Sequence, residues 1–229
     1  MIPLPRPCVC LVTDRRAVTP DARTTRDELI GLEAQLDAAC EAGVDLIQVR
    51  ERDIDGGALS AFVRRLVTRS PAGTRIVVND RADVAGAAAA AGVHLRADGP
   101  PASRVRTAAW GPWLIGRSIH TSDEAAGAND ADYLIFGTVF PSRSKPEGSP
   151  VSGIDGLGAA CTASRLPVLA IGGISPDRVD ACRAAGAAGV AAIGLFLPVG
   201  RTPGALGPAE AVRALRGAWG GMLQLPRFA

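Results

Sequence analysis

The sequence predicts an α/β fold, a single (β/α)8 TIM barrel, on three observations. Short and almost wholly apolar runs recur along the chain of 229 residues, as expected for parallel strands that are covered on both faces. Alanine-rich segments with helical spacing separate these runs, and eight such units are the number that closes a barrel. No G-x-G-x-x-G motif follows the first run, which disfavours the rival architecture, an open doubly wound sheet.

The expected strands are the apolar runs themselves. In chain order they are Cys8–Thr13, Asp45–Val49, Arg75–Asn79, Gly92–Leu95, Trp113–Arg117, Asp132–Phe136, Pro167–Ile171 and Ala188–Ile193. The clearest helix between them is expected over Thr25–Glu41, where leucines recur at helical spacing. Several alanine-rich segments end in Ala-Gly before a strand, and glycine suits the left-handed cap of a helix. These pairs are Ala42-Gly43, Ala91-Gly92 and Ala185-Gly186.

One domain is expected over residues 1–229, because no linker-like segment divides the chain. The barrel proper is expected over about residues 8–220, followed by a frayed tail after Met222. The longest irregular stretch, Gly137–Ser152, is rich in serine, proline and glycine. Loops of this length are often functional, and this one follows the sixth expected strand.

Charge and composition disfavour several classes of protein. The net charge is only +2 and no lysine- or arginine-rich block occurs, so no nucleic-acid partner is expected. Without a long apolar run or a signal segment, we expect a cytoplasmic protein that does not contact membranes. The five cysteines have no metal-ligand spacing and are expected to be free thiols. They are Cys8, Cys10, Cys40, Cys161 and Cys182.

Polar residues concentrate where the expected strands end, and the active sites of such barrels lie at that rim. The candidates are Arg50 and Arg52 after the second strand, Asn79 and Asp80 after the third, Ser118 and His120 after the fifth, Thr138, Ser142, Arg143, Ser144 and Lys145 after the sixth, Gly172 and Gly173 after the seventh, and Ile193 and Gly194 after the eighth. Unrelated surface residues would be scattered over both ends of the barrel.

The glycines of this rim predict a phosphate site. Gly172 and Gly173 precede a helix expected to begin near Pro176, where bare N–H groups and the helix dipole attract anions. Gly194 is expected to complete the pocket. The arginines and Lys145 add attraction for phosphate or carboxylate. The plainer interpretation is that the glycines make tight turns and the cations form a solvated rim.

Two further residues have both a chemical and a structural interpretation. Asp80 offers a hard oxygen ligand for Mg²⁺ together with Asn79, but an aspartate there equally suits the N-cap of the next helix. His120 is placed to move protons as a general acid or base, or to make a structural hydrogen bond. His94 lies within a strand and is expected to pack or bond internally.

Six short motifs recur in chain order: Leu11–Asp14, Ile47–Arg52, Val78–Asp83, Gly92–Leu95, Gly116–His120 and Ala170–Ile174. Together they resemble the superfamily of thiamine phosphate synthase and thiazole tautomerase over roughly Val9–Phe196. The resemblance implies a (β/α)8 barrel that binds a small phosphorylated thiazole, often as a homodimer. In the synthase it implies phosphate or pyrophosphate contacts from the residues at Arg50, Arg52, Ser118, the loop Ser142–Lys145, Gly172 and Gly173.

The resemblance implies different requirements for the two activities. A synthase joins thiazole phosphate to a pyrimidine pyrophosphate with Mg²⁺ held by two aspartates. The first matches Asp80, but the second position is Gly99, and Asp98 lies one residue early. Arg52 replaces a lysine of the synthase. A tautomerase has the forms Arg-Glu-Arg and Gly-Arg-Ser-x-His, and both occur here, with its catalytic histidine at His120.

On this balance the sequence favours an isomerase, a thiazole tautomerase without any cofactor. His120 would shuttle the proton, an arginine would hold the substrate carboxylate, and the glycines would hold the phosphate. The first alternative is the Mg²⁺-dependent synthase, a transferase, which Asp80 and the loop Pro141–Lys145 favour. The second alternative is a non-catalytic regulatory barrel that binds a phosphorylated ligand.

Overall fold

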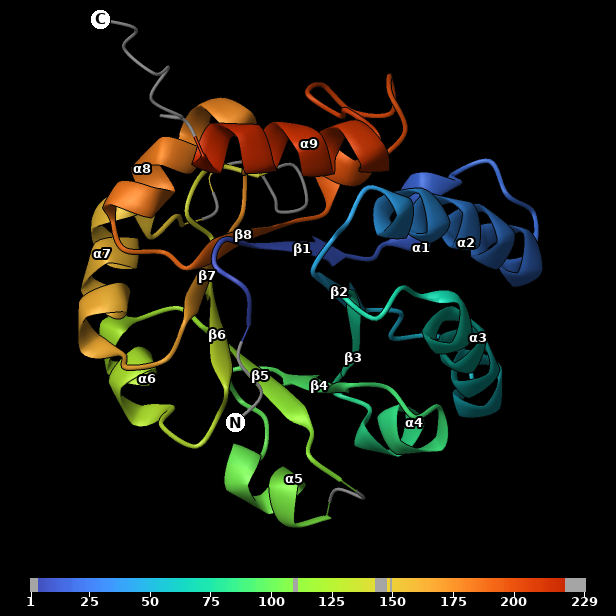
Figure 1. The fold of residues 1–229 in the computed structure, drawn as a ribbon, viewed down its shortest axis with the longest axis horizontal. Helices are drawn as coiled ribbons and strands as arrows, with labels where there is room; N and C mark the ends of the chain where they lie inside the picture. The colour runs from blue at the N-terminus through green and yellow to red at the C-terminus, as the bar shows by residue number, and fades with distance from the viewer. Residues whose placement is uncertain (1–3, 109–110, 143–147, 149, 221–229) are drawn as a thin grey trace, which may run out of the picture.

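The computed structural model is a closed barrel of eight parallel strands in the order β1-β2-β3-β4-β5-β6-β7-β8, with β8 paired to β1 (Figure 1). It describes residues 4–108, 111–142, 148 and 150–220. The predicted TIM barrel is therefore confirmed. The frayed tail expected after Met222 lies outside the described residues.

The strands lie where the apolar runs placed them, with ends that differ by a residue or two. They are β1 Cys8–Val12, β2 Leu46–Val49, β3 Arg75–Asn79, β4 Gly92–Leu95, β5 Leu114–Ile119, β6 Tyr133–Gly137, β7 Val168–Ile171 and β8 Gly189–Ala192. Each strand is buried almost throughout, because the barrel interior covers one face and the helices cover the other.

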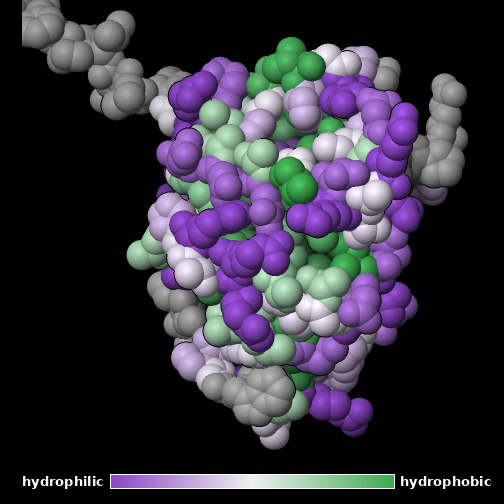
Figure 2. Space-filling model, turned by 90° about the vertical axis from the view of Figure 1, so that its right-hand side faces the viewer, coloured by the Kyte–Doolittle hydropathy of each residue, from purple (hydrophilic) through white to green (hydrophobic). Residues whose placement is uncertain are grey.

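Helices form a ring outside the strands (Figure 1). The α-helices are α1 Arg15–Val18, α2 Thr25–Glu41, α3 Gly56–Arg69, α4 Ala82–Ala87, α5 Ala102–Ala108, α6 Ser122–Gly127, α7 Gly153–Ala163, α8 Val179–Ala184 and α9 Pro208–Trp219; the 3-10 helices are η1 Pro176–Arg178 and η2 Gly194–Phe196. The side of the molecule where α2 and α3 lie is mostly hydrophilic, with scattered hydrophobic residues (Figure 2). No helix among the described residues is long and apolar enough to cross a membrane.

The Ala-Gly pairs have two different roles. Gly43 and Gly186 follow helices in the left-handed conformation, with φ of 83° and 93°, as predicted for helix caps. The prediction is wrong for Gly92, which begins β4. A Cβ there would lie 1.9 Å from the Leu114 carbonyl oxygen, so this glycine permits close strand pairing. The left-handed residue of that turn is Ala89, with φ of 53°.

The apolar core has two layers because side chains alternate along each strand. In β1, Val9 and Leu11 point outward and pack under the helices. Cys8, Cys10 and Val12 point inward and fill the barrel. All five cysteines are free thiols, as predicted. Burial raises the pKa of the Cys8 and Cys10 thiols, so both behave as small apolar core residues.

Candidate active site

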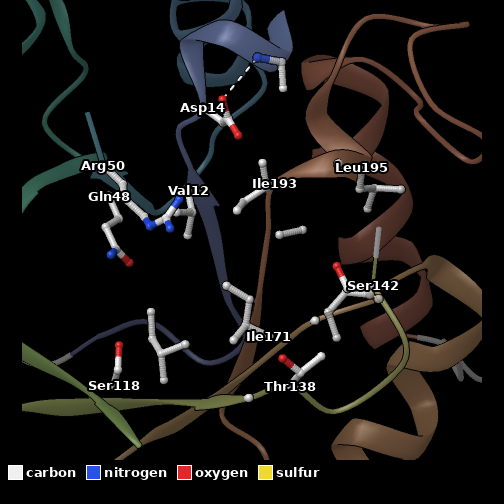
Figure 3. Close-up of a pocket in the computed structure, with 18 of the residues that line it drawn as sticks. Val12, Asp14, Gln48, Arg50, Ser118, Thr138, Ser142, Ile171, Ile193 and Leu195 are labelled. Carbon is white, nitrogen blue, oxygen red and sulfur yellow. Dashed lines mark hydrogen bonds between the residues drawn. The ribbon is translucent and has the colours of Figure 1, made fainter. Parts of the chain in front are cut away.

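A cavity of about 1140 Å³ lies at the carboxyl ends of the strands. Figure 3 shows Gln48, Arg50 and Ser118 on one side of it and Thr138 and Ser142 on the other. Apolar side chains of Val12, Ile135, Ile171 and Ile193 also line it. The cavity therefore combines flat apolar surface with polar groups from many strands, which is typical of small-molecule sites.

The floor of the cavity contains a buried histidine. His94 on β4 bonds to the Tyr133 hydroxyl through Nδ1 at 3.1 Å and to the Ser118 hydroxyl through Nε2 at 2.9 Å. Gly116 makes room for this pair, because a Cβ there would lie 2.5 Å from His94 Nδ1. Burial, and secondarily the charge of Arg117, lowers the pKa of His94 to about 3. A neutral imidazole therefore holds the Ser118 hydroxyl at the cavity surface.

A second pair of polar side chains extends this floor. The Gln48 amide donates to Asn79 Oδ1 at 2.8 Å, and the Asn79 amide donates to Asp80 Oδ2 at 2.9 Å. Both amide side chains line the cavity. Since amides both donate and accept, they suit the ring nitrogens and substituents of a heteroaromatic ligand.

Arg50 enters the cavity from the end of β2, and a buried network fixes its backbone. Its N–H donates to Thr13 Oγ1 at 2.8 Å, and the Thr13 hydroxyl donates to Glu51 Oε1 at 2.6 Å. Arg15 bonds the other oxygen of Glu51 at 3.0 Å and Asp53 at 2.7 Å. This network ties the ends of β1 and β2 together and so orients Arg50.

The glycines after β7 both adopt a backbone conformation that favours glycine. Gly172 and Gly173 are left-handed, with φ of 101° and 59°. A Cβ on Gly173 would lie 2.4 Å from the Pro141 carbonyl oxygen, because the segment after β6 packs directly against this turn. Arg178 also lines the cavity, donates to the Gly173 carbonyl at 2.7 Å and stacks over Phe140 at 4.8 Å. The pocket thus includes a cation that the sequence motifs did not indicate.

Asp80 is not a helix cap. The N-cap of α4 is Arg81, without a side-chain bond, so that interpretation is wrong. Asp80 has φ of 59°, a conformation that aspartate tolerates better than most residues. Its carboxylate accepts from the Arg96 backbone N–H at 3.0 Å and pairs with Arg96 Nε at 3.1 Å. Arg96 lines the cavity, whereas Asp80 does not.

The residues around Asp80 do not fit a two-carboxylate Mg²⁺ site. Asp98, the nearest candidate for the second ligand, is 76% exposed and lies 3.5 Å from the same Arg96 nitrogen. The described residues contain no cluster of three or more histidine, cysteine or acidic side chains that could hold a metal ion. The cation that joins the two carboxylates here is Arg96 itself.

The loop that carries Asp98 is held in place by Arg117. The Arg117 guanidinium donates to the carbonyls of Arg96 and Ala97, both at 3.2 Å, and to those of Gly99 and Pro100. These bonds hold the backbone on both sides of Asp98. Arg117 is therefore a structural residue of the β4–α5 loop.

Most of the predicted site residues come together around the cavity. Those that line it are Arg50, Arg52, Asn79, Ser118, His120, Thr138, Ser142, Gly172, Gly173, Ile193 and Gly194. His120 is exposed and bonds to the Gly137 carbonyl through Nδ1. Ser144, Lys145 and Arg143 lie outside the described residues. The cavity residues that were not predicted include Gln48, His94, Arg96 and Arg178, although the first three stand in or beside the motifs.

Fold and site together define a (β/α)8 barrel with a cavity at the carboxyl ends of its strands. Arginines line this cavity, and polar side chains lie on two sides of it. The sequence model described as thiamine monophosphate synthase matches residues 10–196. The chain belongs to this family.

Curated relatives support the same assignment. A putative thiamine-phosphate synthase of Geobacter sulfurreducens is 41% identical over 72% of this chain and 78% of its own length. A thiamine-phosphate synthase of Roseiflexus castenholzii is 37% identical over 93% of this chain and 90% of its own. Among solved structures, thiamine phosphate pyrophosphorylase from Pyrococcus furiosus is 27% identical, with a TM-score of 0.73 over 94% of this chain and 96% of that one.

These relatives overturn the prediction of a thiazole tautomerase, an isomerase, because those of 34–41% identity carry the synthase name. The structure gives two letters of the motifs a structural role. Glu51 of the Arg-Glu-Arg motif is buried against Thr13 and Arg15, and Arg117 of the Gly-Arg-Ser motif holds a loop. Neither residue lines the cavity, whereas Arg52 and His120 of the same two motifs do.

Proposed function

We propose that the protein is a thiamine-phosphate synthase, a transferase that joins thiazole phosphate to hydroxymethylpyrimidine pyrophosphate. The observation that carries the proposal is a cavity with room for two substrates and with several cations at its rim. Its volume of about 1140 Å³ exceeds the roughly 300–1,000 Å³ usual for one small ligand. The names of the relatives supply the product, thiamine phosphate, and the family resemblance supplies the two substrates.

The reaction breaks the bond between the pyrimidine methylene carbon and the pyrophosphate oxygen, and the thiazole nitrogen supplies the electron pair for the new C–N bond. Pyrophosphate leaves with the electrons of the broken bond. Negative charge grows on that leaving group in the transition state, so fixed positive groups beside it lower the barrier. Arg50, Arg52 and Arg96 line the cavity and are assigned this role.

The remaining groups orient the two rings. Gln48 and Asn79 hydrogen-bond the pyrimidine, and the Ser118 hydroxyl, held by neutral His94, bonds the pyrophosphate. The backbone around Gly172, Gly173 and Gly194 binds the thiazole phosphate, with Arg178 beside it. Held this way, the two reactants meet at high effective concentration.

The deciding experiment supplies the purified protein with both substrates and measures thiamine phosphate and released pyrophosphate. We expect equal amounts of the two products. Arg50→Gln should lower kcat/KM by about 100-fold, as loss of a group that stabilises developing charge does. Arg213→Gln on α9, an exposed residue outside the cavity lining, is the matched control. Binding of both substrates without turnover would refute the proposal and favour a regulatory barrel.

A further inference from the structure

We propose that Arg96 serves as a built-in cation for the pyrophosphate group, in the place where the family resemblance implies a metal ion between two aspartates. The inference rests on the proposed function for the identity of the ligand. It follows from the disagreement between the donor set expected for Mg²⁺ and the residues that surround Asp80.

The first line of evidence is that a positive charge already joins the acidic groups. Arg96 Nε lies 3.1 Å from Asp80 Oδ2 and 3.5 Å from Asp98 Oδ1. The Arg96 backbone N–H also donates to Asp80 Oδ1, so both oxygens of that carboxylate are used. A divalent cation bound there would face the guanidinium across the same oxygens, and like charges repel.

The second line of evidence is that Arg117 holds the β4–α5 loop, which carries Arg96 and Asp98, by its backbone. Arg117 is buried and donates to four carbonyls of this loop. Asp98 therefore stays at the surface, and the position one residue later is Gly99, which has no carboxylate. The loop thus supplies an arginine to the cavity and no second metal ligand.

The third line of evidence is that the Arg96 side chain is accessible to a ligand in the cavity. It lines the cavity and is 54% exposed, so an incoming anion can reach it. The planar guanidinium carries five N–H donors and binds phosphate oxygens in pairs. Arg50 and Arg52 line the same cavity, so pyrophosphate would meet three guanidinium groups.

The first test measures binding of inorganic pyrophosphate by calorimetry in excess EDTA and again with saturating Mg²⁺. We expect the wild-type protein to bind in EDTA with an affinity close to that in Mg²⁺. Arg96→Gln should weaken binding in EDTA by about tenfold or more, as loss of a bond to a charged group does. Arg104→Gln, an exposed arginine of α5 outside the cavity, should bind like the wild type.

The second test asks whether the metal site can be rebuilt. The double variant Arg96→Gly/Gly99→Asp removes the guanidinium and places a carboxylate at the later position. Gly99 is not left-handed, and the nearest atom to an added Cβ is the Arg96 carbonyl oxygen at 3.1 Å, so the loop needs only a small adjustment. With pyrophosphate present, we expect Mn²⁺ binding, followed by electron paramagnetic resonance, in the double variant and none of comparable affinity in the wild type.

Loss of wild-type pyrophosphate binding in EDTA would overturn the proposal, and so would unchanged binding by Arg96→Gln. Circular dichroism and thermal unfolding show whether each variant is folded. Arg96→Lys guards against misfolding, because a retained charge without the planar fork should give intermediate affinity in EDTA. All these readouts are binding measurements, so a lack of synthase turnover would refute the proposed function and leave this inference separately testable.

Discussion

Gly116 shows how one missing side chain shapes the floor of the cavity. A Cβ on this residue would lie 2.1 Å from Tyr133 Cζ and 2.5 Å from His94 Nδ1. Both of those side chains are buried in the barrel, so an added methyl group would have to displace them. The hydrogen bonds of His94 therefore depend on a glycine of the neighbouring strand.

Replacement of this glycine should be costly. We expect Gly116→Ala to lower the free energy of unfolding by about 1–3 kcal/mol, the usual cost of overpacking a core. Urea unfolding at neutral pH measures it. Gly127→Ala is the matched control, because nothing lies within 4 Å of an added Cβ there. Equal stability of the two variants would mean that the floor tolerates repacking.

The buried His94 should also make stability depend on pH. Its pKa is lowered to about 3 by burial, against about 6.5 in the unfolded chain. The unfolded state therefore binds the extra proton between these values, and the stabilisation present above pH 6.5 is lost as the pH falls toward 3.

The variant His94→Gln lacks this titration. Between pH 6.5 and 4.5 the wild type should lose about 2 kcal/mol more unfolding free energy than the variant, because the unfolded histidine is already half protonated at the upper value. Urea unfolding at both pH values gives the comparison, in which groups that titrate in both proteins cancel. Parallel losses in the two proteins would show that His94 becomes charged without unfolding.

The ends of β1 and β2 are joined by a buried charge network rather than by apolar contact. Arg15 is only 4% exposed and pairs with Glu28, Glu51 and Asp53. Burial raises the pKa of Glu51, although its bonds to Thr13 and Arg15 oppose the shift. These two strand ends supply Arg50 and Asp14 to the cavity, so the network links stability to the geometry of the site.

Loss of the central cation should leave Glu51 without its charged partner. We expect Arg15→Met to lower the unfolding free energy by about 3–5 kcal/mol, as breaking a buried ion pair does. The adjacent Arg16, 68% exposed and also paired with Asp53, provides the control. Arg16→Met should cost less than about 1 kcal/mol. If thermal and urea unfolding give similar small losses for both, the network does not hold these strands.

Charge is distributed unevenly over the whole molecule. The net charge is only +2, yet among the described residues four arginines line the cavity with two aspartates, Asp14 and Asp98. A rim of this kind attracts anions from a distance, and salt screens that attraction. The barrel therefore concentrates its positive charge where the substrates of the proposed reaction carry phosphate.

Binding of charged and uncharged ligands should respond differently to salt. Raising NaCl from about 0.05 to about 0.5 M should weaken binding of inorganic pyrophosphate several-fold. The added salt shortens the Debye length and so screens the attraction between the arginines and the pyrophosphate. Hydroxymethylpyrimidine, the uncharged alcohol, should bind almost independently of salt. Calorimetry with both ligands makes the comparison. An equal salt effect on both ligands would contradict a role for the arginine rim.

The strands, the clearest helix and the rim residues could be predicted from the chain alone, because their signals are local. Apolar runs mark strands covered on both faces, and parallel strands bring their carboxyl ends to one rim. The positions of Arg50, Ser118 and Gly172 directly after such runs were enough to assign them to that rim. The caps at Gly43 and Gly186 followed from the same short-range rules.

Side-chain partners could not be predicted, because closure of the barrel brings together residues far apart in the chain. Only the tertiary structure places Arg178 on the Gly173 carbonyl, Gly92 against Leu114, and Arg96 on Asp80. It also shows that Glu51 and Arg117, two letters of the motifs, bind buried groups and backbone carbonyls. A motif records which residue is present, whereas its role depends on the atoms that surround it in three dimensions.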